Sequence, residues 1–86
     1  QNKLIVMLDQ AINERVSAKI SFDTNSNNLE KANSAEQILL KSYESGTINF
    51  NDVLDIQELQ LKFQMKQIEA IKGFYMQSTI INYLSM

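Results

Sequence analysis

The sequence predicts an all-α protein, a long antiparallel αα-hairpin whose two helices pack along a coiled-coil-like seam. The 86 residues include two glycines and no proline, so the chain has few places for the sharp turns that a sheet of short strands requires. Apolar residues recur at spacings of three, four and seven in both halves of the chain, which indicates helices with an apolar face. One clear turn signal separates the halves, at residues 45–49.

The first helix is expected over residues 3–45. Its apolar stripe begins with Leu4, Leu8, Ala11, Ile12 and Val16 and continues at heptad spacings through Leu29, Ala32, Leu39 and Tyr43. Glu36 holds the one position of the later stripe that is not apolar. Residues 23–28 are six polar residues of middling to poor helix propensity, so a break there is the alternative. Because the segment contains neither Gly nor Pro, we expect one continuous helix.

The tip turn is expected at residues 46–49. Gly46 suits the position just after a helix, where a left-handed backbone is reached without the steric cost of a Cβ. Asn49 is an N-cap residue, and Asp52 at the third helical position places a negative charge beside the positive end of the next helix dipole. So short a connection is typical of two antiparallel neighbouring helices.

The second helix is expected over residues 50–84. Leu54, Leu61, Ile68 and Tyr75 repeat at sevens, and we predict that Leu54 and Leu61 form the helix seam with Leu39 and Tyr43. Further apolar residues flank this line on both sides: Val53, Ile56, Leu59, Phe63, Ile71 and Phe74. Gln57, Gln60, Gln64 and Gln67 form a polar stripe. The apolar surface is wider than one seam, so we expect the helix to pack against neighbours beyond its hairpin partner.

The dimensions support the same expectation. Each arm would be roughly 55–65 Å long at 1.5 Å per residue. A rod of this shape has no central core, so its stability should require neighbouring hairpins. We therefore expect this hairpin to be one part of a larger protein.

The composition excludes several classes of function. Without Cys the chain offers no thiol nucleophile or disulfide, and without His it offers no triad base or imidazole metal ligand. We expect no metal site and no cofactor. The net charge of −2 provides no basic footprint, so nucleic acid is not an expected partner. The longest apolar run, residues 4–8, is too short to span a bilayer as a helix.

The residues around the turn resemble a signature of the TolC-like outer-membrane efflux proteins. In that family a Tyr-x-x-Gly tip precedes a helix that opens with Asp-Val-Leu-Asp or Glu, a small residue and Gln. The matching residues here are Tyr43, Gly46, Asp52, Val53, Leu54, Asp55 and Gln57. A weaker likeness extends over most of the chain, including Leu-Glu-Lys-Ala at positions 29–32. A lone Tyr-x-x-Gly carries no information, whereas this joint pattern between two heptad-like arms is fairly specific.

The resemblance implies a periplasmic hairpin from the C-terminal repeat of a homotrimeric efflux or secretion channel. Such channels work with a periplasmic adaptor protein and an inner-membrane pump, and they meet the outer membrane through barrel strands that lie outside this chain. By resemblance, Gly46, Thr47, Ile48 and Asn49 would contact the adaptor, and Asp52 and Asp55 would form acidic rings at the pore entrance.

Each of these residues also has a plainer interpretation. Gly46 can serve simply to end a helix, Asp52 and Asp55 to cap the next one, and Tyr43 to pack in the seam. Catalysis would depend on Asp52 and Asp55 as an acid–base pair, but two carboxylates at a helix start have no expected pocket, so we do not expect an enzyme. The alternative function is a stand-alone coiled-coil module for oligomerisation or scaffolding.

Overall fold

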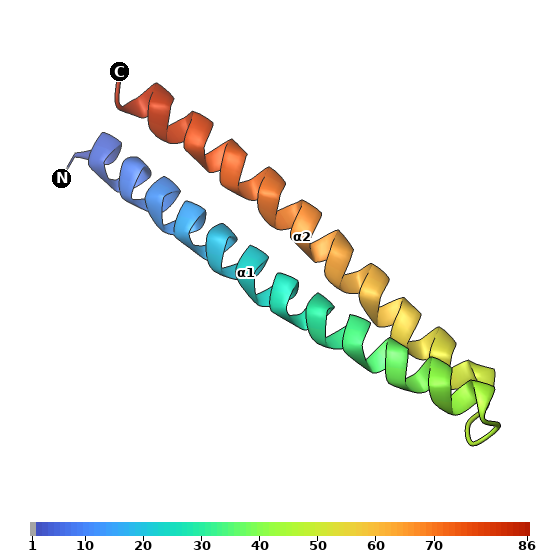
Figure 1. Cartoon of the computed structure of the whole chain (residues 1–86). Helices are drawn as coiled ribbons and strands as arrows, with labels where there is room; N and C mark the ends of the chain where they lie inside the picture. Colours follow the sequence, from blue (N-terminus) through green and yellow to red (C-terminus); the bar gives the residue numbers. More distant parts are fainter. Residues whose placement is uncertain (1) are drawn as a thin grey trace.

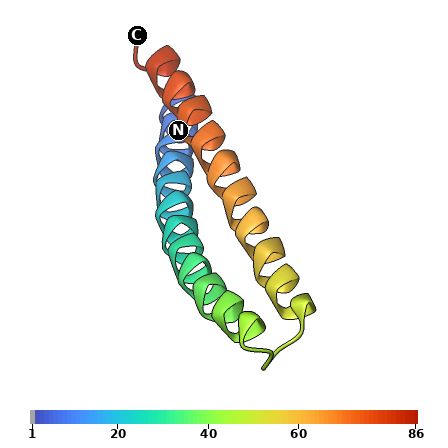
Figure 2. The ribbon, with the colours of Figure 1, turned by 45° about the vertical axis from the view of Figure 1, so that its right-hand side comes forward.

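The protein is a rod made of two antiparallel helices (Figure 1). The computed structural model describes residues 2–86, with α1 over Lys3–Glu44 and α2 over Phe50–Leu84. The rod measures 65 × 16 × 13 Å, and both helices bend gently along their length (Figure 2). The described residues contain no strand. The all-α hairpin predicted from the sequence is therefore confirmed, and the helix bounds agree with the expected ones to within one residue.

Helix α1 runs without a break through its polar segment. It begins at Asn2, whose side chain accepts a hydrogen bond from the Leu4 N–H at 2.9 Å. Within residues 23–28, Asn25 is buried and donates to the Ser21 carbonyl one turn earlier, at 2.8 Å. Because this amide is satisfied within the same helix, a polar side chain is accommodated in the seam and the helix continues.

The tip turn closes with a pair of backbone hydrogen bonds typical of a Schellman motif. The Thr47 N–H donates to the Ser42 carbonyl at 2.9 Å, and the Gly46 N–H donates to the Tyr43 carbonyl at 3.0 Å. Gly46 makes this geometry possible, since its φ of +79° lies in the left-handed region. The sequence-based prediction for Gly46 as the residue after the helix end is confirmed.

Helix α2 begins as its capping residues predict. The Asn49 side chain accepts a hydrogen bond from the Asn51 N–H at 2.7 Å. Asp52 lies in the first turn, where a carboxylate interacts favourably with the helix dipole. The helix ends at Ser85, whose N–H donates to the Ile81 carbonyl at 2.9 Å.

The two helices meet along a narrow seam of heptad positions. Four apolar residues are buried in it, namely Ala11, Ala32, Val53 and Ala70, and Val53 is fully buried. Other seam positions are partly buried and include several large apolar side chains: Leu8, Phe22, Leu29, Leu39, Ile56, Phe63, Phe74, Ile81 and Leu84. Small side chains at the buried positions let the helices approach closely, as at Gly73, where an added Cβ would lie 3.8 Å from the Ala18 Cβ.

The prediction that Leu54 and Leu61 lie in the seam is wrong. Their side chains are 45% and 58% exposed, whereas Val53, one residue earlier, is 0% exposed. One residue turns a helix by about 100°, so the row through Leu54 faces away from α1. The true seam row of α2 continues from Val53 through Gln60 and Gln67 to Phe74, and its two polar members conceal it in the sequence. Leu39 does lie partly buried at the seam.

Candidate functional site: the tip and the outer face of the second helix

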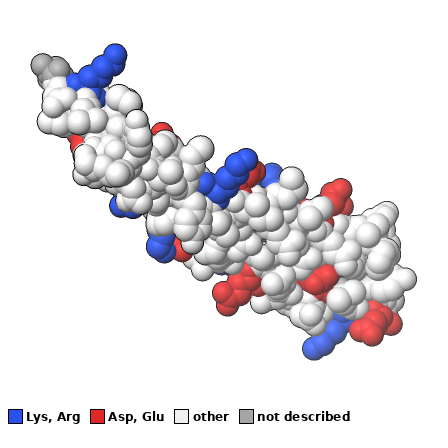
Figure 3. Space-filling view, turned by 90° about the horizontal axis from the view of Figure 1, so that it is seen from above, with Lys and Arg blue, Asp and Glu red and all other residues white. Residues whose placement is uncertain are grey.

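The tip region, residues 36–58, carries half of the acidic residues of the chain and one of its eight basic residues. Between residues 36 and 58 the sequence has five acidic residues, Glu36, Glu44, Asp52, Asp55 and Glu58, and one basic residue, Lys41. Figure 3 shows acidic side chains gathered toward this end of the rod. The tip region therefore has a net charge of −4, against −2 for the whole chain. An acidic end of this kind attracts cations and basic surfaces.

The structure places the two predicted entrance carboxylates on the surface near the tip. Asp52 and Asp55 are three residues apart in the first turns of α2 and are both exposed. Neither takes part in a salt bridge within the described residues, where the one salt bridge joins Lys19 and Asp23 at 3.1 Å. Both carboxylates are thus available to a partner or to counterions.

The tip turn itself is accessible. Gly46, Thr47 and Asn49 are exposed and Ile48 is partly buried. A Cβ added at Gly46 would meet nothing within 4 Å, so a side chain there would project into open space. The backbone conformation, and not crowding within the hairpin, is what requires glycine at this position.

Two aromatic rings pack against each other at the base of the turn. The rings of Tyr43 and Phe50 lie 5.2 Å apart between centroids at a tilt of 59°, an arrangement that aromatic pairs favour. Tyr43 lies in the last turn of α1 and Phe50 begins α2, so the pair joins the two helices just beside the loop. Tyr43 is 44% exposed, which places it at the edge of the seam.

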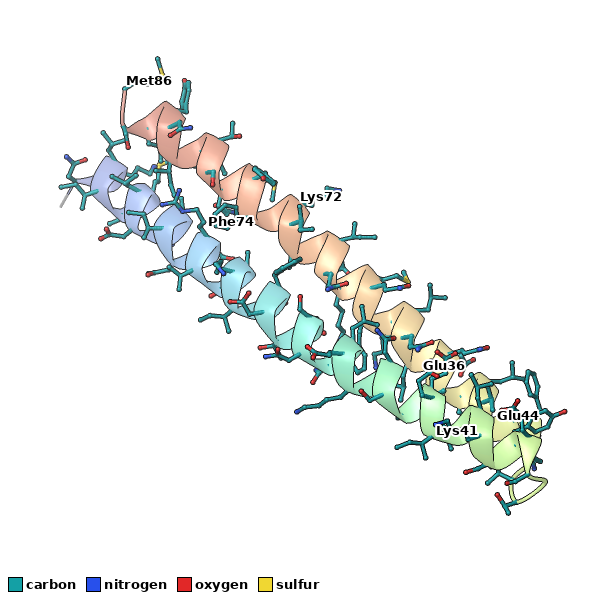
Figure 4. All side chains as sticks on the ribbon, viewed as in Figure 1. Glu36, Lys41, Glu44, Lys72, Phe74 and Met86 are labelled. Atoms are coloured by element: carbon teal, nitrogen blue, oxygen red, sulfur yellow. The ribbon has the colours of Figure 1, made fainter. Side chains whose placement is uncertain are left out.

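A set of polar side chains joins the helices next to the tip, and we call it the polar ladder. Glu36 accepts hydrogen bonds from Gln60 at 2.9 Å and from Gln57 at 3.0 Å. Gln60 also donates to Asn33 at 2.9 Å. Figure 4 shows Glu36 on the side of α1 that faces α2. These hydrogen bonds to its charged form, from Gln60 first and then Gln57, hold the pKa of Glu36 below its ordinary value of 4.5.

Further contacts between polar side chains continue the polar ladder away from the tip. Gln67 donates to the Ser26 hydroxyl at 2.9 Å, and near the open end Arg15 donates to Ser78 at 3.5 Å and lies 5.8 Å from the ring centre of Phe74. Three of the four glutamines expected as a stripe on the second helix, Gln57, Gln60 and Gln67, therefore donate hydrogen bonds to side chains of α1. Gln64, the fourth, is exposed. The seven-residue spacing of Gln60 and Gln67, in line with Val53 and Phe74, is the signal that could have located this seam.

The outer face of α2 carries a row of exposed apolar residues at heptad spacing. We call Leu54, Leu61, Ile68 and Tyr75 the outer row. The last two are 65% and 66% exposed, and the row lies about 100° around the helix from the buried Val53 line. Helix α2 thus has one apolar line against α1 and a second one that no described residue covers.

No protein-family model matches this chain, and no curated protein or solved structure matches it either. The likeness to TolC-like channels therefore depends on the residues around the tip and on the hairpin shape. Two further observations hold for the described residues alone. No helix is long and apolar enough to cross a membrane, and no cluster of side chains could hold a metal ion.

Proposed function

We propose that this chain is a wall segment in the periplasmic helical tunnel of a trimeric TolC-like outer-membrane efflux or secretion channel. The observation that carries the proposal is the two-sided character of α2. A helix in a simple pair needs one apolar line, whereas a helix in the wall of a barrel touches a neighbour on each side. The outer row supplies the second contact line.

The tip supports the proposed direction of the segment. Gly46 makes a short accessible loop, which is the end that would face the periplasmic adaptor protein. Asp52 and Asp55 are exposed directly behind it. In a homotrimer, three copies of each carboxylate would form rings near the tunnel entrance, and such rings favour cations. An inner-membrane pump would supply the energy for transport, since the hairpin itself is a passive conduit.

Variants of the complete channel protein in its own cells test the proposal. Leu61→Glu places a charge in the outer row and should abolish the trimer, as measured by native size, while Ser34→Glu, which adds the same charge at an exposed position of α1, should leave it intact. Asp52→Asn with Asp55→Asn should preserve the trimer and weaken block of the reconstituted channel by cations. A normal trimer with Leu61→Glu, together with unchanged cation block, would contradict the proposal.

A stand-alone oligomerisation or scaffold module remains the second candidate, because the outer row by itself accounts for lateral association. The tip distinguishes the two functions. Gly46→Asn adds a side chain to the loop with a residue that tolerates the left-handed conformation. Loss of export with an intact trimer supports the channel. If Leu61→Glu disrupts assembly while every tip variant leaves export unchanged, the scaffold function is correct.

A further inference from the structure

The hairpin exposes more surface than a compact protein of its size. Its accessible area is 6491 Å², whereas a folded monomer of 9.9 kDa exposes about 5,200 Å². The excess is about 1,300 Å², and a standard protein interface covers about 800 Å² on each partner. The rod thus has enough surplus surface for one full interface without loss of its hairpin seam.

The four residues of the outer row are arranged symmetrically about the point between residues 64 and 65 of α2. In an antiparallel pair of α2 helices centred between residues 64 and 65, Leu54 lies at the level of Tyr75 and Leu61 at the level of Ile68. Met65, which is 56% exposed, borders the outer row and lies directly beside the symmetry axis, level with residue 64 of the other copy. Apolar residues of one copy therefore meet apolar residues of the other along the whole row, which is the self-complementarity that a two-fold interface requires.

The charges beside the outer row favour the same arrangement. Glu58 and Lys72 lie seven residues to either side of Met65, on the same side of the helix, and both are exposed. Figure 4 shows Lys72 on the side of α2 away from α1. In the antiparallel pair, Glu58 of each copy lies level with residue 71 of the other, one residue from Lys72, and the long lysine side chain spans this offset of about 1.5 Å along the helix. A parallel pair would instead place Glu58 level with Glu58 and Lys72 level with Lys72, about 14 residues apart along the helix, and so would lack this attraction.

We propose that a second copy of this chain docks on the outer row, forming a two-fold antiparallel α2–α2 dimer with two Glu58–Lys72 pairs. This inference goes beyond the proposed channel and does not depend on it, because it concerns the 86-residue hairpin by itself. The dimer uses a surface that neighbouring hairpins would cover in the channel, so the two assemblies exclude each other.

Sedimentation equilibrium of the 86-residue chain gives the first test, with helix content followed by circular dichroism. The wild type should be a dimer at about 100 µM, and Leu61→Glu should weaken the dimer at least about 100-fold. Ile38→Glu, at an exposed apolar position of α1 outside the outer row, is the matched control and should dimerise normally. A wild-type chain that stays monomeric at this concentration, or that forms trimers, overturns the proposal.

The charged pair tests the orientation and does not require a change in the apolar row. Glu58→Lys alone should weaken the dimer about tenfold, because both attractive pairs become like-charge contacts. Adding Lys72→Glu in the same chain should restore the wild-type affinity. A parallel dimer would not bring residue 58 near residue 72 in either variant, so failure of this restoration overturns the antiparallel arrangement.

Disulfide trapping supplies an independent measurement, since the natural chain has no cysteine. Met65→Cys lies beside the proposed axis, where the dimer would bring the Cβ atoms of the two copies near disulfide range, and should cross-link rapidly on oxidation. Thr79→Cys lies on the same side of α2 but would be level with residue 50 of the other copy and should not cross-link. Equal cross-linking at both positions indicates a parallel pair and contradicts the proposal.

Discussion

Truncation of Val53 to alanine tests the register of the hairpin. Among residues 2–86, Val53 is the one large side chain that is fully buried, so Val53→Ala removes two carbon atoms from the seam. At about 0.8 kcal/mol per buried CH₂ the loss is about 1.6 kcal/mol. A residual cavity adds to this cost, and the better helix propensity of alanine offsets up to about 0.6 kcal/mol. We expect a net destabilisation of about 1.5 kcal/mol.

Leu54→Ala is the matched control at the neighbouring position. Its side chain is already half exposed, so we expect a change within about 0.5 kcal/mol. Urea unfolding followed by helical circular dichroism measures both variants, and with a slope near 1 kcal/mol per molar urea Val53→Ala should lower the midpoint by about 1.5 M. The measurement is made at low micromolar concentration, where self-association does not bury Leu54. A larger loss for Leu54→Ala than for Val53→Ala would refute the register.

Three further predictions concern other positions. Gly73→Ala should raise the free energy of unfolding by up to about 1 kcal/mol in the same urea assay. Alanine favours a helix interior, and the new Cβ meets Ala18 at an ordinary contact distance of 3.8 Å. A lower free energy of unfolding would contradict this prediction. Gly46→Ala should lower the free energy of unfolding by about 1–2 kcal/mol, since alanine is strained at a φ of +79°. Gly46→Asn should lower it by less. Equal losses for the two variants would show that the left-handed conformation is not the cause. The pKa of Glu36 is lower in the folded chain than its ordinary value of 4.5, so the folded state binds fewer protons and Glu36 stabilises the protein above that value. As pH falls below 4.5 through the folded pKa, this stabilisation is lost. The Glu36→Gln variant should therefore lose less thermal stability than the wild type between pH 6 and pH 3. Equal losses in the two proteins would show that Glu36 does not contribute.

Local chemistry explains which parts of the fold the sequence predicts. The turn at Gly46 and the cap at Asn49 depend on residues within a few positions of one another, and both have the expected geometry. The continuity of α1 through residues 23–28 follows from the absence of Gly and Pro and from the hydrogen bond between Asn25 and Ser21. Features of this kind depend on residues within one helix or turn and not on how the two helices pack together.

The register of the seam depends instead on the other helix. A pattern of apolar residues marks Leu54 and Leu61 as the buried row, because Gln60 and Gln67 interrupt the true one. Only the partners on α1 make these glutamines favourable in the seam, namely Glu36 and Asn33 for Gln60 and Ser26 for Gln67. The sequence shows the polar residues of each helix, but not which of them meet.

The location of the site is predictable only in part, for the same reason. Asp52 and Asp55 are placed by their position in the first turns of α2, and the structure leaves both exposed. The breadth of the apolar surface on α2 is also visible in the sequence. The sequence does not show which half of that surface faces outward, because this depends on the register of the seam.

The distribution of side chains indicates where the stability of the assembled protein arises. The buried apolar positions of the seam hold three alanines and one valine, and hydrogen-bonded polar groups fill other seam positions, whereas leucine, isoleucine and tyrosine form the exposed outer row. Burial of an alanine contributes far less free energy than burial of a leucine. Hydrogen bonds between polar seam residues add modest net stability, and their main effect is to disfavour other registers. The seam therefore selects one alignment of the two helices, and the outer row leaves large apolar side chains exposed that a neighbour can bury. It follows that association on the outer row should raise the unfolding midpoint of the hairpin as the protein concentration increases.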